Sequence, residues 1–157
     1  MASTANRKLL GSVVAMAASF MASTAQAQSF ECDYSRSCIH PSQVISPERA
    51  LGIKRQAGGH ALIVDVDTHS RASAAGGPSG IDVQVPFTGP MAEPRPDFAH
   101  KVDDELTLRR MRHYEPVILA CGSRQCAVRA ALRLQEHGYS NVYIVRYGNE
   151  SLPVAHR

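Results

Sequence analysis

Hydrophobic and polar positions follow two different periods along the chain, and these periods predict strands and helices in turn. Continuous apolar runs bounded by polar residues predict strands that are buried on both faces, as in a parallel sheet. Such strands are expected at 61–66, 116–120 and 141–145, and the alternation of apolar and polar residues at 81–86 predicts a strand with one more polar face. Apolar residues at helical spacing, together with end signals, predict helices at 47–55, 97–113 and 126–137. The alternation of the two predicts an α/β protein, an open parallel sheet with helices on both faces.

Polar residues, glycines and prolines mark where these elements begin and end. Ser46 can cap the first helix, Asp97 can cap the second, and Gly138 can end the third. Residues 67–80 are rich in Ser, Ala and Gly, and residues 88–97 carry three prolines. Both stretches therefore predict loops.

The N-terminus predicts export. Arg7 and Lys8 precede an apolar run of about 14 residues, which is shorter than the roughly 20 that a membrane-spanning helix needs. The run leads to Ala25-Gln26-Ala27, a small-x-small cleavage site, so residues 1–27 read as a removed signal peptide. The alternative is a buried N-terminal helix. We expect a periplasmic or secreted domain with no membrane association after cleavage.

Charge and composition point away from nucleic acid and from metal. The formal net charge of +3 falls to +1 once the predicted signal peptide is removed, and no basic run is interleaved with aromatic residues. Neither close pair of cysteines, Cys32 with Cys38 or Cys121 with Cys126, has the C-x2-C spacing that is typical of a zinc site. The histidines are scattered, and we interpret each as a surface residue: His40, His60, His69, His100, His113, His137 and His156. The sequence thus predicts neither a metal nor a cofactor, and it leaves the oligomeric state open.

Four cysteines fall into two close pairs, which in an exported protein usually indicates disulfides. We expect Cys32 and Cys38 to form a local disulfide, the alternative being that one of them reaches Cys121 or Cys126 as a resolving thiol. Cys121 and Cys126 could also pair across a strand–helix junction. Otherwise Cys126 is a small apolar residue in the first turn of the helix.

Cys121 is the residue whose position best suits chemistry. It directly follows the strand at 116–120, and so lies where open α/β sheets bind ligands. The N–H groups of the following loop and the positive helix end stabilise a thiolate, and Arg124 and Arg129 add positive charge. This pattern indicates a nucleophile that carries an anionic adduct, the alternative being an inert buried cysteine.

In their order and spacing, these segments resemble a single-domain rhodanese, from Ile45 to about Tyr147. The segments that carry the resemblance are Ile45-Ser46-Pro47-Glu48, Leu62-Ile63-Val64-Asp65-Val66, Gly80 through Pro86, and Pro116 through Tyr143. The resemblance implies a rhodanese-like fold and a sulfurtransferase that holds sulfane sulfur as a persulfide on Cys121. A small sulfur-containing donor and a thiophilic acceptor would be its partners. The active loop implied by the resemblance consists of Gly122, Ser123, Arg124, Gln125 and Cys126.

The signal-peptide pattern, the cysteine pairs and the resemblance together divide the chain into four parts. These are a signal peptide at 1–27, an irregular segment with a possible disulfide at 28–44, a rhodanese-like domain at 45–148 and a tail at 149–157.

Several positions depart from the family pattern. The loop lacks the usual mid-loop glycine, and Asp67 stands where an arginine commonly follows Asp-Val. Cys126 is similar to the second cysteine of exported rhodanese-like proteins linked to quinoprotein alcohol oxidation, although Ala127 replaces their tryptophan. Two other functions therefore stay open: a thiol–disulfide redox protein that uses Cys121 and Cys126, and a catalytically inactive binding module.

Overall fold

The computed structural model describes residues 31–32, 38–68, 80–89, 91, 93–146 and 152. Its main sheet has five strands, β3 (Val44–Ile45), β4 (Leu62–Asp65), β5 (Val83–Gln84), β6 (Val117–Ala120) and β7 (Val142–Val145). They are all parallel and lie in the order β3-β7-β6-β4-β5. Three helices accompany the sheet: α1 (Pro47–Gln56), α2 (Phe98–Leu108) and α3 (Arg124–Glu136). The predicted class, an open parallel α/β sheet, is confirmed.

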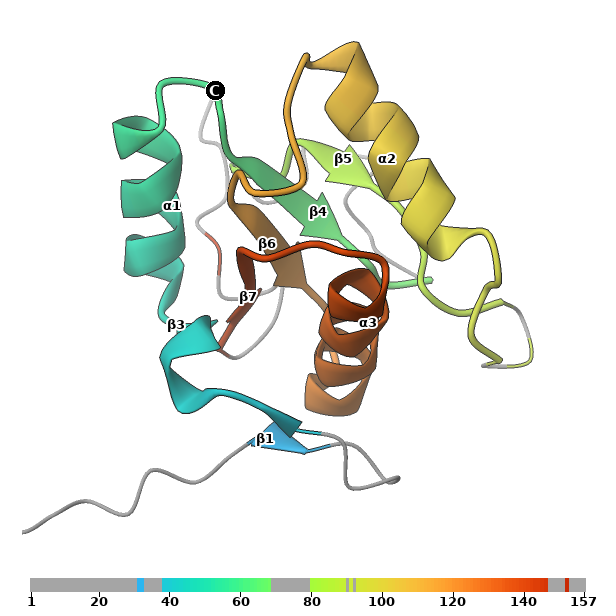
Figure 1. Cartoon of the computed structure of the whole chain (residues 1–157). Helices are drawn as coiled ribbons and strands as arrows, with labels where there is room; N and C mark the ends of the chain where they lie inside the picture. The colour runs from blue at the N-terminus through green and yellow to red at the C-terminus, as the bar shows by residue number, and fades with distance from the viewer. Residues whose placement is uncertain are drawn as a thin grey trace, which may run out of the picture.

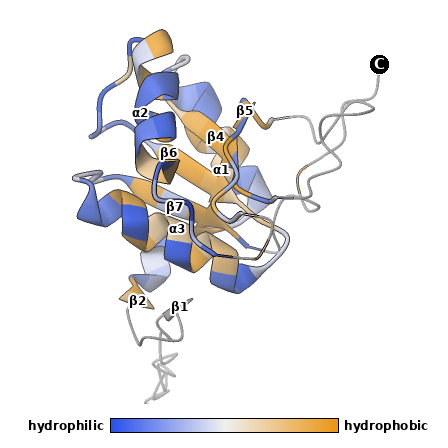
Figure 2. Ribbon diagram, turned by 90° about the vertical axis from the view of Figure 1, so that its right-hand side faces the viewer, coloured by the Kyte–Doolittle hydropathy of each residue, from blue (hydrophilic) through white to orange (hydrophobic). Residues whose placement is uncertain are grey.

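Helices cover both faces of the sheet, with α1 on one side and α2 and α3 on the other (Figure 1). Successive residues of the central strands pack on opposite faces of the sheet, and each face has its own buried cluster. Leu119 and Cys121 belong to the buried cluster that contains the residues of α2 and α3, whereas Ile118 and Ala120 belong to the cluster beneath α1. All four are buried, as two-sided coverage of a parallel sheet requires. Hydrophobic colour accordingly follows the central strands in Figure 2, and hydrophilic residues lie on the helices.

The ends of the helices confirm some of the predicted start and stop residues and not others. Ser46 caps α1 as predicted, and its side chain accepts the N–H of Arg49. Asp97 precedes α2 but makes no capping hydrogen bond, because its carboxylate pairs with Arg95 and Lys101. The helix predicted to reach residue 113 stops at Leu108, and the chain turns at Arg110, which has a φ of 56°.

The second strand of the sequence prediction, 81–86, is reduced to the two residues of β5 at the sheet edge. Asp82 holds this edge in place. Its carboxylate accepts the Ile63 N–H at 2.9 Å and pairs with Lys54 at 2.5 Å. Lys54 also donates to the Gly80 carbonyl, so α1 and the start of β5 are tied together through one side chain.

The segment predicted to be irregular contains regular structure. β1 (Glu31–Cys32) and β2 (Cys38–Ile39) form an antiparallel pair, followed by the short helix η1 (Pro41–Gln43) and by β3. Ile39 is fully buried in the core cluster on the α3 side, which explains why this segment packs on the domain. At the other end, Leu152, predicted to lie in a tail, is buried in the cluster beneath α1.

The predicted signal peptide at 1–27 lies outside the described residues, as does most of the loop predicted at 67–80. Within the described part of the chain, no helix has the length and apolar character needed to cross a membrane.

Candidate functional site

Cys121 lies at the carboxyl end of β6, directly before the loop that leads into α3. β6 is flanked by β4 and β7, so Cys121 follows an inner strand of the sheet. Only 4% of its surface is exposed. The structure thus puts Cys121 where the sequence predicts it, at the strand–helix junction.

Cys121 is bonded to Cys126, and the Cα atoms of the two residues are 6.2 Å apart. Cys126 lies in the first turn of α3, and its sulfur is 3.8 Å from the carbonyl oxygen of Val66 at the end of β4. The disulfide therefore closes the active loop on itself. Of the two alternatives for Cys126, the structure has the disulfide.

The other cysteine pair lies in the N-terminal hairpin. Cys38 is disulfide-bonded, and the register of β1 and β2 puts Cys32 directly opposite it. The side chain of Cys32 is outside the described residues, so the predicted Cys32–Cys38 bond stays a prediction. Since Cys121 and Cys126 are bonded to each other, neither is joined to Cys38.

Several N–H groups of the active loop are engaged by the protein itself. Ser123 caps α3: its hydroxyl accepts the N–H of Cys126 and its carbonyl accepts the N–H of Ala127. Because of this cap α3 begins at Arg124, two residues earlier than predicted, so Arg124 and Gln125 belong to the helix. The N–H of Gly122 donates to the carboxylate of Asp67 at 3.2 Å.

Asp67 is the site residue whose role the sequence does not reveal. It follows β4, where the N–H of Asp67 donates to the carboxylate of Asp65, a fully buried side chain at the end of that strand. The Asp67 carboxylate then reaches across to the N–H next to Cys121. The sequence indicates only that an aspartate replaces an arginine. Its consequence is a negative charge at a position where a persulfide or thiosulfate would need positive partial charge.

The two arginines expected to assist Cys121 differ in their surroundings. Arg124 is an exposed residue at the start of α3. The guanidinium of Arg129, one turn further on, lies 5.7 Å from the ring centre of Phe87, over its face. Arg129 thus packs on an aromatic side chain that follows β5, at the same end of the sheet as Cys121.

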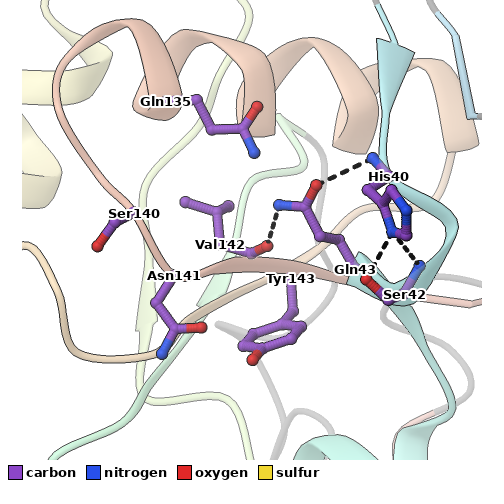
Figure 3. Close-up of a pocket in the computed structure, with 8 residues that line it drawn as sticks. All are labelled: His40, Ser42, Gln43, Gln135, Ser140, Asn141, Val142 and Tyr143. Carbon is purple, nitrogen blue, oxygen red and sulfur yellow. Dashed lines mark hydrogen bonds between the residues drawn. The ribbon is translucent and has the colours of Figure 1, made fainter.

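A pocket of about 360 Å³ lies at the amino ends of the strands, away from Cys121. It is bordered by Gln43, which donates to the Val142 carbonyl at 2.8 Å, and by His40, whose N–H donates to Gln43 (Figure 3). Ligands of parallel α/β sheets bind at the carboxyl ends. We therefore assign the candidate site to Cys121 and its loop and not to this pocket.

Among the described residues, one group of side chains has metal-ligand chemistry, formed by His100, Asp103 and His137. His137 directly follows α3, whereas Cys126 is in its first turn, so the two sites are separated by the length of that helix. Nothing in the spacing of these residues along the chain identifies the group, apart from the i, i+3 relation of His100 and Asp103.

Comparison with known proteins agrees with this geometry. Residues 50–152 match the family described as "Rhodanese-like domain". The chain belongs to this family. No curated protein matches the chain. Thirteen solved chains match the rhodanese-like structure.

Three of these solved structures illustrate the likeness. A crystal structure of Rv0390 from M. tuberculosis is 24% identical, with a TM-score of 0.50, over 66% of this chain and 76% of that one. The Alr3790 protein from Anabaena sp. is 14% identical, with a TM-score of 0.48, over 68% and 82%. A polysulfide-sulfur transferase homodimer from Wolinella succinogenes is 19% identical, with a TM-score of 0.48, over 73% and 78%. Identities this low bear on the fold and not on the substrate.

Proposed function

We propose that this rhodanese-like chain is a sulfurtransferase that carries sulfane sulfur as a persulfide on Cys121 after the Cys121–Cys126 disulfide has been reduced. The observation that carries the proposal is the position of Cys121. It follows an inner parallel strand, precedes a helix and is shielded from bulk water. The dipole of α3 favours negative charge there.

The first step is thiol–disulfide exchange, in which two electrons from a dithiol reductant convert Cys121 and Cys126 to free thiols. The Cys121 thiolate then attacks the outer sulfur of a donor such as thiosulfate. A new S–S bond forms on Cys121, the S–S bond of the donor breaks, and sulfite leaves with the electron pair. In the last step a thiophilic acceptor attacks the outer sulfur, and Cys121 leaves as the thiolate.

The test is sulfur transfer from thiosulfate to cyanide, measured as thiocyanate, with the protein as purified and after reduction. We expect turnover only after reduction, none in Cys121→Ser, and turnover without reductant in Cys126→Ser. Mass spectrometry of the thiosulfate-treated Cys126→Ser protein should show one extra sulfur atom on Cys121. Thiocyanate formation that persists unchanged in Cys121→Ser would refute the proposal.

A second candidate function, thiol–disulfide exchange itself, is favoured by two contacts. The pair is bonded in the structure, and the Asp67 carboxylate occupies the Gly122 N–H that would otherwise face an anionic adduct. Equilibration with glutathione buffers measures the reduction potential of the pair. A moderate potential, together with no persulfide on the reduced protein after thiosulfate or polysulfide treatment, would select this function over sulfur transfer.

We also propose that the protein acts in the periplasm or outside the cell, on the basis of the signal-peptide pattern at 1–27. An oxidising compartment suits a protein whose cysteines are bonded. N-terminal sequencing of the protein isolated from a cell fraction should give a start near Gln28. A start at Met1 in the cytoplasmic fraction would contradict export.

A further inference from the structure

Three imidazoles and a phenol surround one carboxylate at the end of α3 remote from Cys121. The carboxylate belongs to Asp103 in α2, whose side chain is 26% exposed. One of its oxygens, Oδ2, is 3.0 Å from Nε2 of His137 and 3.8 Å from Nδ1 of His100. The other, Oδ1, accepts the hydroxyl of Tyr139 at 2.5 Å and lies 3.0 Å from Nε2 of His113.

The fold brings these residues together from separate elements. His100 and Asp103 lie one turn apart on α2, and His137 follows the last residue of α3. Gly138 then turns the chain with a φ of 93°, a conformation that glycine adopts without strain. This turn buries the Tyr139 ring, so that its hydroxyl reaches the α2 carboxylate.

The cluster offers more than one nitrogen ligand. Three imidazoles, those of His100, His113 and His137, lie around the one carboxylate of Asp103. The rings of His100 and His137 meet edge to face with their centres 4.9 Å apart, so the two imidazoles are close enough to serve one site. The neutral imidazole is a common metal ligand in proteins.

We propose that His100, Asp103 and His137 bind a divalent transition-metal ion of the Zn²⁺ class. Their ligand atoms all lie within 4.8 Å of one another. Bonds of about 2.0–2.2 Å to a tetrahedral ion require ligand atoms somewhat closer than this. His100 is 73% exposed and can rotate inward to supply that approach. Three protein ligands leave the fourth position to water or to an outside ligand.

The donor set selects the kind of ion. Two imidazole nitrogens and one carboxylate oxygen suit Zn²⁺, Cu²⁺ or Ni²⁺, whereas Ca²⁺ and Mg²⁺ prefer oxygen ligands alone.

Tyr139 and His113 act as positioning residues for the carboxylate. Both contact Oδ1, so they orient Asp103 and leave Oδ2 toward His100 and His137. Burial disfavours the charged carboxylate, but hydrogen bonds from Tyr139 and His137 and the nearby imidazoles outweigh it and lower the pKa of Asp103. Burial and the contact with Asp103 in turn raise the pKa of the Tyr139 hydroxyl, which stays protonated and donating. Such outer contacts typically affect metal affinity by 10–100-fold.

Zn²⁺ titration by calorimetry tests the site, with the full chain kept oxidised so that its cysteines stay bonded. We expect one equivalent to bind, with affinity reduced at least about tenfold in His100→Ala and in His137→Ala. His60→Ala is the matched control, because His60 also pairs with a carboxylate, that of Glu115 at 2.9 Å, but lies outside the cluster. Its affinity should equal that of the parent.

Co²⁺ supplies a spectroscopic readout that is independent of stability. Visible d–d bands of a four-coordinate ion should appear in the parent and be lost in His100→Ala, whose exposed side chain makes unfolding no explanation. Parent-like Zn²⁺ affinity in His100→Ala, an equal loss in His60→Ala, or a thiolate-to-cobalt charge-transfer band would each overturn the proposal. Sulfur transfer plays no part in these measurements, so the site stands or falls separately from the proposed function.

Discussion

The Asp67→Asn substitution tests how the protein controls the reactivity of its central cysteine. Asp67 accepts the N–H of Gly122, the residue that follows Cys121. An asparagine side chain has the same shape, and its carbonyl oxygen can accept the same hydrogen bond. The substitution thus removes a negative charge beside the sulfur and leaves the loop in place. We expect the reduced Cys121 to react faster in the variant.

The size of the effect follows from the separation of the two groups. One hydrogen bond and one residue lie between the carboxylate and the sulfur, a distance of roughly 6 Å. Asp67 is partly exposed, so an effective dielectric constant of about 40 is appropriate, and the repulsion is then about 1.4 kcal/mol. This corresponds to about a tenfold change in the thiolate population. Since a more stable thiolate is also a weaker nucleophile, the rate should rise about threefold to tenfold.

The assay is alkylation by iodoacetamide near neutral pH, in a Cys126→Ser background so that Cys121 has no bonding partner. Asp104→Asn serves as the charge-matched control, because Asp104 is an exposed residue of α2. The rate should rise in Asp67→Asn alone, and added salt should narrow the difference. An unchanged or slower rate, or an equal rise in Asp104→Asn, would refute the electrostatic reasoning.

Three further predictions concern stability, each read from urea unfolding. The Cys121–Cys126 cross-link spans a sequence separation of 5, so Cys126→Ser should lower the free energy of unfolding by about 2 kcal/mol; an unchanged midpoint would contradict this. Ser123→Ala removes the side-chain cap of α3 and should lower the free energy of unfolding by about 1 kcal/mol. Ser123→Thr keeps a hydroxyl at this position, so it should retain most of the stability that the cap provides. The lowered pKa of Asp103 stabilises the fold above about pH 4, and the gain is lost as pH falls through the folded value. The parent should therefore exceed Asp103→Asn in stability at pH 7, and a gap that does not narrow as the pH falls below about 4 would count against this assignment.

The layered fold could be predicted because its signals are local. A run such as Val117–Ala120 is buried whichever neighbours it has, and a serine before a proline, as at Ser46, caps a helix because its hydroxyl accepts an N–H only three residues further on. Cys121 could be placed for the same reason, since its position depends only on where one strand ends and one helix begins.

Competition for one side chain within a segment, and contacts between distant segments, could not be predicted in this way. Asp97 has the chemistry of a cap, but Arg95 and Lys101 compete for its carboxylate. β3 consists of two residues, and only its pairing with β7 identifies it as a strand. The Asp67–Gly122 contact joins residues 55 positions apart, and its existence depends on the register of β4 against β6.

Two of the departures from the family pattern, Asp67 and Cys126, bear on the same sulfur atom. While the disulfide is intact, Cys121 cannot form a thiolate. After reduction, the nearby Asp67 carboxylate disfavours the negative charge of that thiolate. The disulfide acts before reduction and the carboxylate acts after it, so two variants can distinguish the two effects. Cys126→Ser should abolish the need for a reductant and leave the thiolate disfavoured. Asp67→Asn should retain the need for a reductant and speed the reaction that follows. Under the proposed sulfur-transfer function, sulfur uptake therefore depends on the supply of a dithiol reductant as well as on the supply of a donor.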